Sequence, residues 1–307
     1  MTLPNIVINF HAVHDAEWME RVLCLLTRTY TIVSLGELEQ FYYQGRILKN
    51  SCHLTFDDGD LTFFECVYPL LKKHGIPASI YVSPLQARNN GNFWFQEIRG
   101  YDPLILCQLT KRVIYATSLD LNSSNVYAYM KNLSLHQIWD IIEEYKKETQ
   151  TQAKPRQNMN LEELMDIYSN GLVEIGAHTQ NHPILANEKD SVSEYEIQSS
   201  IKELGDMFGK EIKYFAYPNG IPGLDFGSRE IELLKQAGVR MAFSTHVKHF
   251  SLKDNVFSIP RNGLSRGGNT FMLMKLILGG GWEVIKKSKV GKQEEFLRKM
   301  LKVNHEG

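Results

Sequence analysis

Short runs rich in β-branched and aromatic residues alternate along this chain with longer segments that carry apolar residues at three- and four-residue spacing. Because strands joined by crossover helices pair in parallel, this alternation predicts βα units and a parallel sheet. The runs that we expect to form strands are residues 6–10, 31–33, 53–56, 78–82, 173–177, 214–217, 239–244 and 256–259.

The segments between these runs have the pattern of crossover helices, and Gly75 and Gly238 are placed as helix stops. At 307 residues the chain is longer than a typical single domain, but parallel α/β barrels reach this length around one core. We therefore predict an α/β fold in which residues 1–307 form one domain, a distorted parallel (β/α) barrel of about seven strands. The helices are expected at residues 17–27, 61–74, 193–208 and 228–236.

Two segments depart from the alternation. Residues from about 86 to 170 are rich in helix formers and polar residues, so we expect a mainly helical insertion within one barrel loop. Its start, residues 92–95, gathers aromatic side chains that would form either a sugar-stacking wall or a small local core. Residues from about 282 to 303 place apolar side chains among lysines, which predicts an amphipathic helix that covers the barrel. A basic amphipathic helix can also bind membranes.

Composition narrows the setting of the protein. The 34 basic and 35 acidic residues leave a formal net charge of −1, so no overall field favours nucleic acid or an anionic membrane. The four cysteines form no CxxC pair, which argues against a zinc knuckle and a disulfide framework. No stretch approaches the roughly 18 apolar residues of a membrane-spanning helix, and no signal-peptide pattern is found. We expect a soluble cytoplasmic protein without stable membrane insertion that acts on a neutral small molecule or glycan.

Two of the predicted strands end in residues that commonly bind metal ions. Asp57 and Asp58 close one run, and His178 and His182 follow a later one. The carboxyl ends of parallel barrel strands form one rim, where active sites lie. A carboxylate and two imidazoles are ligands of catalytic zinc, which keeps a fourth position for water. The pattern predicts a hydrolytic metal site with a spare carboxylate, although Asp-Asp-Gly is also an ordinary turn or helix N-cap.

Other polar residues also follow predicted strands and belong to the same rim. His11 follows the first run, Asn219 lies in a Pro-Asn-Gly turn after the sixth, His246 follows the seventh and Arg261 the last. Each of these signals is weak alone, because a histidine near a barrel mouth often has only a structural role. Because all of them follow predicted strands, the combination indicates an active site at the rim more specifically than any single residue does.

Residues 55–59 read Thr-Phe-Asp-Asp-Gly, and residues 178–182 fit the pattern His-Ser/Thr-x-x-His. These sequences resemble the first and second motifs of the polysaccharide deacetylase family, also called the NodB-homology group or carbohydrate esterase family four. The resemblance covers most of the chain outside the insertion. It implies a NodB-like deacetylase domain that hydrolyses N-acetyl groups on a saccharide with a divalent ion, zinc or another first-row metal.

The resemblance also implies a role for each motif residue. Asp57 would be the catalytic base, while Asp58, His178 and His182 would hold the metal. Two neighbouring carboxylates can differ in this way because a metal ligand stays anionic while its neighbour is free to accept a proton. In the family a third motif supplies a backbone N–H for the oxyanion, and here that residue is Asn219.

The chain departs from the family pattern at two points. Ala216 stands where many members have the arginine that orients the base, and Arg261 is the candidate substitute, with an ordinary surface ion pair as the alternative. No Leu-x-His fifth motif is found in the C-terminal part. His11 is therefore our first choice for the general acid that protonates the leaving amine, and His14 and His246 are the alternatives.

Three functions are compatible with the sequence. The leading one is a metal-dependent N-deacetylase of a saccharide or glycan, and a cytoplasmic setting favours a nucleotide- or lipid-linked precursor as its substrate. The second is a hydrolase of another non-peptide C–N bond, as in small cyclic amides. The third is a non-catalytic glycan-binding protein on the same fold. The intact base and ligands favour an enzyme, whereas Ala216 and the missing fifth motif favour the binding protein.

Overall fold

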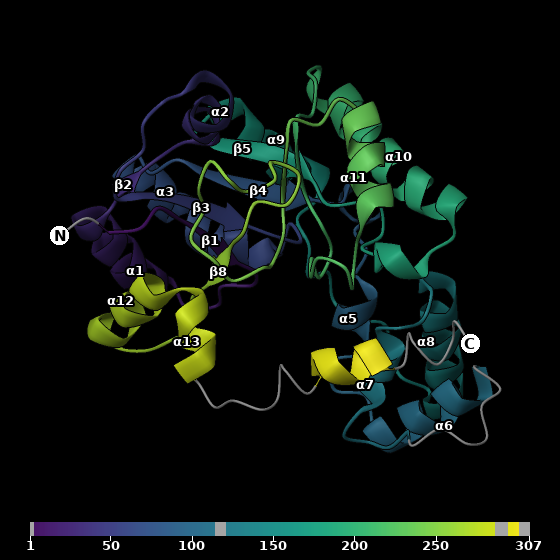
Figure 1. Ribbon diagram of the computed structural model, residues 1–307. Coiled ribbons are helices and arrows are strands. Elements are labelled where there is room, and N and C mark those ends of the chain that lie inside the picture. Colours follow the sequence, from purple (N-terminus) through teal and green to yellow (C-terminus); the bar gives the residue numbers. More distant parts are fainter. Residues whose placement is uncertain (1–2, 114–120, 286–293, 301–307) are drawn as a thin grey trace.

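The computed structural model describes residues 3–113, 121–285 and 294–300, and a parallel sheet curved into a barrel forms its centre (Figure 1). The strand order is β7-β6-β5-β4-β3-β1-β8, with β2 also beside β3, and every pairing is parallel. The predicted α/β fold with a parallel barrel is confirmed. Its strands are β1 (Ile6–Phe10), β2 (Thr31–Ile32), β3 (Ser51–Phe56), β4 (Ala78–Val82), β5 (Val173–Ala177), β6 (Tyr214–Ala216), β7 (Met241–Phe243) and β8 (Asn262–Gly263).

The last predicted strand is wrong. Within the described structure residues 256–259 form no strand, and Ile259 makes only an isolated parallel bridge to Phe243. β8 begins three residues later and pairs with β1. The segment 259–263 therefore contacts β7 at one end and β1 at the other, and so joins the two edges of the sheet. Because each contact covers only one or two residues, the strand-like run at 256–259 does not pair along its length.

Helices cover the outside of the barrel. The sheet is buried on both faces, as every residue of β1, β3 and β4 is buried, which explains their continuous apolar runs. The predicted helix at 61–74 is divided into a π-helical turn, η1 (Phe63–Val67), and α3. The helices against the barrel are α1 (Ala16–Thr29), α2 (Leu35–Gln44), α3 (Tyr68–His74), α9 (Leu161–Asn170), α10 (Asp190–Phe208), α11 (Ser228–Gln236) and α12 (Asn269–Leu278).

Between β4 and α9 the polypeptide leaves the barrel. Figure 1 shows α6, α7 and α8 grouped at the lower right, away from the sheet. They bury a hydrophobic cluster of their own, in which Leu106, Ile141 and Ile142 are fully buried. By contrast, Leu164 and Ile167 of α9 belong to the barrel core. The helices of this segment are α4 (Pro84–Asn89), α5 (Trp94–Glu97), α6 (Pro103–Val113), α7 (Val126–Met130) and α8 (Leu135–Thr149).

The amphipathic helix predicted at 282–303 lies only partly within the described residues. α13 (Gly280–Ile285) includes the start of that prediction, residues 294–300 are helical, and residues 286–293 and 301–303 lie outside the described residues. Phe296 and Met300 are exposed rather than packed on the barrel. Arg298 is buried and donates a hydrogen bond of 2.5 Å to Asp225, in the loop after β6, and one to the carbonyl of Lys131. This segment therefore joins the insertion to a barrel loop.

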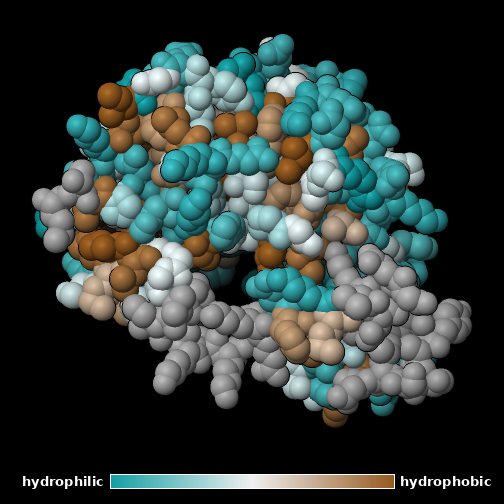
Figure 2. All heavy atoms as spheres, in the orientation of Figure 1, coloured by the Kyte–Doolittle hydropathy of each residue, from teal (hydrophilic) through white to brown (hydrophobic). Residues whose placement is uncertain are grey.

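Apolar side chains also gather on the surface over α12, at the lower left of Figure 2. Phe271, Met274 and Ile277 are 37%, 48% and 42% exposed, while Met272 and Leu276 on the opposite face are buried in the barrel core.

None of the helices in the described part of the chain combines the length and the apolar character needed to cross a bilayer.

Candidate active site

Three side chains that the sequence predicted as metal ligands meet at the carboxyl ends of β3 and β5. Oδ1 of Asp58 lies 3.4 Å from Nε2 of His178 and 3.4 Å from Nε2 of His182. The three candidate ligand atoms lie within 4.8 Å of one another, and all three residues are buried. Asp57 and Asp58 directly follow β3, His178 directly follows β5, and β4 lies between these two strands in the sheet. The barrel register therefore brings together residues about 120 positions apart.

The hydrogen bonding around these atoms fits a bound cation. Oδ1 of Asp58 is buried and accepts no hydrogen bond from the described residues. His178 donates from Nδ1 to the carbonyl of Ala216 at 2.7 Å, which leaves the Nε2 lone pair free on the side of Asp58. A metal-ligating histidine commonly anchors its second nitrogen in this way. The donor set of one carboxylate and two imidazoles suits a first-row divalent ion such as zinc.

The protonation states favour the same conclusion. Burial lowers the pKa of His182, although Asp58 opposes that shift. Burial raises the pKa of Asp58, but in their protonated forms the imidazoles of His178 and His182 outweigh burial through hydrogen bonds and charge, and hold that pKa well below its usual value. A neutral imidazole and an ionised carboxylate are the forms that bind a metal.

The loop that carries the two histidines has an unusual backbone. Thr179 and His182 adopt left-handed conformations with φ of 64° and 58°, as does Asp58 with φ of 71°. Residues other than glycine rarely take this conformation, least of all a β-branched one, and each instance costs on the order of 1–3 kcal/mol. Oγ1 of Thr179 accepts a hydrogen bond from the backbone N–H of His182 at 3.0 Å, which closes the loop.

Asp57, the predicted base, has very different surroundings. The guanidinium of Arg261 donates to both of its carboxylate oxygens at 2.7 Å, and Nδ2 of Asn9 donates to Oδ2 at 3.0 Å. Arg261 is 1% exposed and is itself held by the carbonyl of Ser244, so the alternative of a surface ion pair is wrong. Burial raises the pKa of Asp57, but Arg261 and then His178 outweigh it, so the pKa lies below its usual value.

The three histidines considered as the general acid lie on the exposed surface of the rim. Nε2 of His11 lies 3.9 Å from Oδ2 of Asp57, and its side chain is 56% exposed. His14 and His246 are also exposed. Of these three residues, His11 is the one for which the described structure records an ion-pair contact with Asp57.

The loop after β6 carries Asn219, the predicted oxyanion residue, in a left-handed conformation with φ of 56°. Its carbonyl accepts a hydrogen bond from Oγ1 of Thr245 at 2.7 Å, and its Nδ2 is buried without a partner among the described residues. At Gly220, φ is +73°, and a Cβ atom would lie 2.9 Å from the carbonyl oxygen of Tyr217. Asp225 accepts the backbone N–H of Ile221 at 2.8 Å and so shapes this loop.

The aromatic start of the insertion contacts the metal site. The rings of Phe93 and Phe95 lie 5.2 Å and 4.8 Å from the ring of His182, and Nε1 of Trp94 donates to its carbonyl at 3.2 Å. Phe93 and Trp94 are 0% and 2% exposed, so they pack locally and offer no face to a sugar. Phe95 is half-buried. Nδ1 of His182 has no hydrogen-bond partner in the described chain, so aromatic packing holds this ring.

Sequence reasoning missed two side chains that support the site. Asn9 holds Asp57 from within β1, and Glu196 on α10 accepts hydrogen bonds from the backbone of the histidine loop. A polar residue inside an apolar strand was the available signal for Asn9. Glu196 gave none, because an acidic residue in an amphipathic helix is ordinary.

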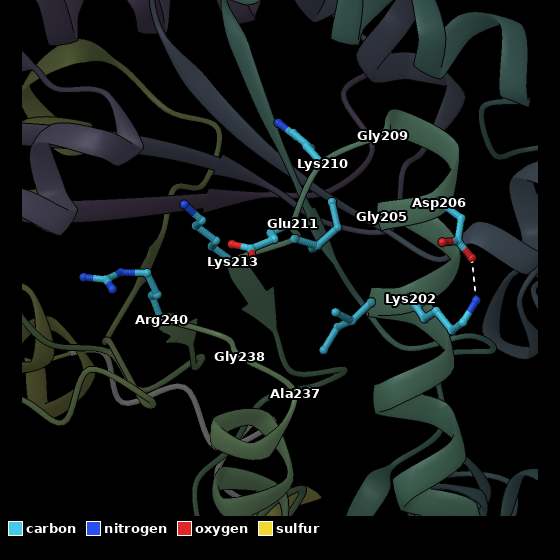
Figure 3. A pocket seen from close by; sticks show the side chains of 12 residues that line it. Lys202, Gly205, Asp206, Gly209, Lys210, Glu211, Lys213, Ala237, Gly238 and Arg240 are labelled. Atoms are coloured by element: carbon cyan, nitrogen blue, oxygen red, sulfur yellow. Dashed lines mark hydrogen bonds and ion pairs between the residues drawn. The ribbon is translucent and has the colours of Figure 1, made fainter.

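A separate cavity lies away from the candidate metal site and Asp57. It has a volume of about 740 Å³ and lies at the amino ends of β6 and β7, opposite the rim (Figure 3). Its lining carries both signs of charge, including Lys202 and Asp206, which pair with each other at 2.6 Å. We assign it no part in the site.

A parallel barrel with two histidines and two adjacent carboxylates at the carboxyl ends of its strands is typical of a metal-dependent hydrolase. Residues 45–242 match the family model described as polysaccharide deacetylase, and the chain belongs to this family. It is 22% identical over 262 residues to the poly-beta-1,6-N-acetyl-D-glucosamine N-deacetylase of Staphylococcus aureus (strain MSSA476). The aligned region covers 83% of this chain and 68% of that protein.

Two solved structures share the fold. The Streptococcus pyogenes deacetylase PplD in complex with acetate has a TM-score of 0.62 and 15% identity, covering 90% of this chain and 99% of that chain. IcaB from Ammonifex degensii has a TM-score of 0.59 and 19% identity, covering 86% and 92%. At these identities the likeness concerns the fold alone.

Proposed function

We propose that this polysaccharide deacetylase removes N-acetyl groups from β-1,6-linked N-acetylglucosamine chains. The family and the name of the Staphylococcus aureus relative support the substrate. One observation carries the chemistry: the buried, unpartnered Oδ1 of Asp58 faces two imidazole nitrogens beside a second buried carboxylate. We further propose zinc as the ion held by Asp58, His178 and His182.

When bound, a divalent ion would supply Lewis acidity that activates a water and polarises the acetamide carbonyl. The residues of the chain would do the rest. The carboxylate of Asp57 accepts a proton from the attacking water, and Arg261 keeps that carboxylate ionised and oriented. The backbone N–H of Asn219 donates to the oxyanion. His11 gives a proton to the leaving nitrogen as the C–N bond breaks, which releases acetate and the free amine.

Acetate release from a panel of substrates tests this proposal. The panel contains β-1,6-linked N-acetylglucosamine oligomers, chitin oligomers, peptidoglycan fragments and nucleotide-linked N-acetyl sugars, and compares zinc-loaded wild type with Asp57→Asn. We expect release from the β-1,6-linked oligomers by the wild type and not by the variant. Release from the nucleotide sugars alone would replace the polymer with a precursor, as the expected cytoplasmic setting favours. No release from any member, despite stoichiometric zinc, would overturn the proposed activity.

A further inference from the structure

The loop between the two candidate metal ligands is held from the outside by one buried carboxylate. Glu196 lies on α10 and is 3% exposed. Its Oε2 accepts the backbone N–H groups of Gln180 at 2.9 Å and of Asn181 at 2.8 Å, and its Oε1 accepts Nδ2 of Asn181 at 2.8 Å. Burial raises the pKa of Glu196, and the N–H donors of Asn181 and Gln180 oppose the rise.

These bonds act on the part of the loop that decides where the imidazoles lie. Gln180 and Asn181 are the two residues between the left-handed Thr179 and the left-handed His182. Two consecutive N–H groups converge on a single oxygen, which fixes the orientation of both peptide planes. A loop of unfavourable backbone conformation persists only when its surroundings over-determine it. Glu196 supplies contacts of that kind from a 19-residue helix.

Metal sites usually gain such support through a hydrogen bond to the ligand's second nitrogen. His178 has this bond, from Nδ1 to the carbonyl of Ala216. His182 does not, because its Nδ1 has no partner among the described residues. The backbone on the amino side of His182 therefore carries more of the positioning, and that backbone is bound to Glu196.

We propose that Glu196 is a positioning residue of the metal site. By accepting the N–H groups of Gln180 and Asn181, it holds the loop in the conformation in which His178 and His182 face Asp58, and so it sets the affinity for the divalent ion. This inference rests on the proposed function only in that these three residues bind a metal.

The same helix offers a matched control. Glu203 lies seven residues after Glu196 and accepts Nε2 of Gln180 at 2.9 Å. It also pairs with Arg88 at the surface. Glu203 therefore contacts a side chain of the same loop, and no hydrogen bond from the loop backbone to Glu203 is found in the described structure. Glu203→Gln makes the same chemical change on the same helix without touching the loop backbone.

The experiment titrates metal-free protein with zinc and measures the dissociation constant for wild type, Glu196→Gln, Glu196→Leu and Glu203→Gln. We expect Glu196→Leu to weaken binding by about 10- to 100-fold, the range for residues that support metal ligands. Glu196→Gln should have a smaller effect, because its carbonyl oxygen still accepts the backbone N–H groups while its amide opposes Nδ2 of Asn181. Glu203→Gln should stay within about twofold of wild type, since its contacts with Gln180 and Arg88 are made by side chains and leave the loop backbone unchanged.

Circular dichroism and thermal unfolding of the metal-free proteins separate positioning from folding. If Glu196→Leu fails to fold, Glu196→Gln decides the question. Excess zinc should restore the turnover of Glu196→Gln, because the ligands themselves are intact. Folded Glu196 variants that bind zinc like wild type, or an equal loss in Glu203→Gln, would overturn the proposal.

Failure of the proposed function gives different results. A wild type that binds no zinc would contradict the metal site, and this inference with it. A wild type that binds zinc but releases no acetate would contradict the proposed reaction alone, and the zinc titrations of the Glu196 variants would still test the positioning role.

Discussion

Asp57 and Asp58 are adjacent in the sequence but lie in two differently built halves of the site. On the Asp57 side, Arg261 and Asn9 occupy both carboxylate oxygens with hydrogen bonds of 2.7–3.0 Å. On the Asp58 side, Oδ1 faces two imidazole nitrogens at 3.4 Å and accepts no hydrogen bond from the described residues. The protein satisfies one carboxylate itself and leaves the other to be completed from outside.

This difference supports the separate tasks proposed for the two carboxylates. A buried charge without a partner is costly, so the charge of Asp58 favours the uptake of a cation. Asp57 gains little from a cation, because Arg261 already balances its charge. Each half can therefore be disrupted alone, and the size and kind of the loss should show which half has been changed.

The largest effect is expected on the Asp58 side. His178→Ala should abolish stoichiometric zinc binding and lower turnover on the order of 10³-fold or more, because the contribution of a catalytic ion amounts to several kcal/mol. Metal content and acetate release measure the two losses. Treatment of the wild type with a chelator should reproduce the loss of activity, and added zinc should reverse it. Full metal content in His178→Ala would remove this residue from the ligand set.

Asp57→Asn should separate the two halves. The variant should keep its zinc, because Asp57 is not among the three proposed ligands, but turnover should fall by about 10²- to 10⁴-fold, the range for the loss of a general base. Parallel measurement of metal content and turnover makes the comparison. If zinc and activity disappear together, the two carboxylates do not have separate tasks.

Arg261→Met tests whether the Asp57 half is self-sufficient. It leaves a buried carboxylate without its ion partner, so the free energy of unfolding should fall by about 3–5 kcal/mol. Urea unfolding of the metal-free protein measures this change. The control is Arg266→Met, since the Arg266 side chain is 66% exposed and 3.6 Å from Asp15, and a loss below about 1 kcal/mol is expected.

The same substitution of Arg261 in the Asp57→Asn background should cost less, because the unpaired charge is then absent. Equal losses in both backgrounds would show that Arg261 stabilises the barrel by packing and not through its pair with Asp57.

The smallest effect concerns a buried histidine outside the site. His53 in β3 contacts the carbonyl of Val33 at 2.8 Å and Oγ of Ser79 at 2.9 Å, and burial lowers its pKa from 6.5 to about 4. The unfolded chain therefore binds a proton at a pH where the folded chain does not. Stability should be full above pH 6.5 and fall as the pH drops toward 4, by on the order of 3 kcal/mol.

Urea unfolding at a series of pH values from 7 to 4 measures this loss, and His53→Gln is the control because it removes the titrating group. The wild type should lose more stability than the variant between pH 6.5 and 4. Equal slopes would assign the acid sensitivity to other groups, with the site histidines as the first candidates.

The sequence predicted the candidate site residues that directly follow a strand. Asp57, Asp58, His178 and His182 follow clear strand-length runs, and parallel strands bring their carboxyl ends to one rim. The barrel itself was predicted for the same reason. An apolar run of five or six residues is enough to place a strand, and the motifs directly follow the strand ends.

Contacts between distant parts of the chain were only partly predictable: Arg261 was a candidate to orient Asp57, but an ordinary surface ion pair was an equal alternative. The bond between Arg261 and Asp57 spans 204 residues, and its two-pronged geometry depends on how the segment 259–263 closes the barrel. That segment contains one bridge and a two-residue strand, so it has no period to detect. Glu196 accepts two of its three hydrogen bonds from backbone N–H groups, which carry no residue-type signal.

The pair of Arg298 and Asp225 also spans a long stretch of chain, 73 residues, and it bears on the order of events during synthesis. Asp225 holds the loop of Asn219 through the N–H of Ile221. At about 5–20 residues per second, the ribosome adds Arg298 roughly 4–15 seconds after Asp225. Until then the carboxylate of Asp225, in the loop after β6, lacks its ion pair with Arg298. A chain truncated before residue 298 should therefore be cleaved by protease in this loop faster than the 307-residue chain.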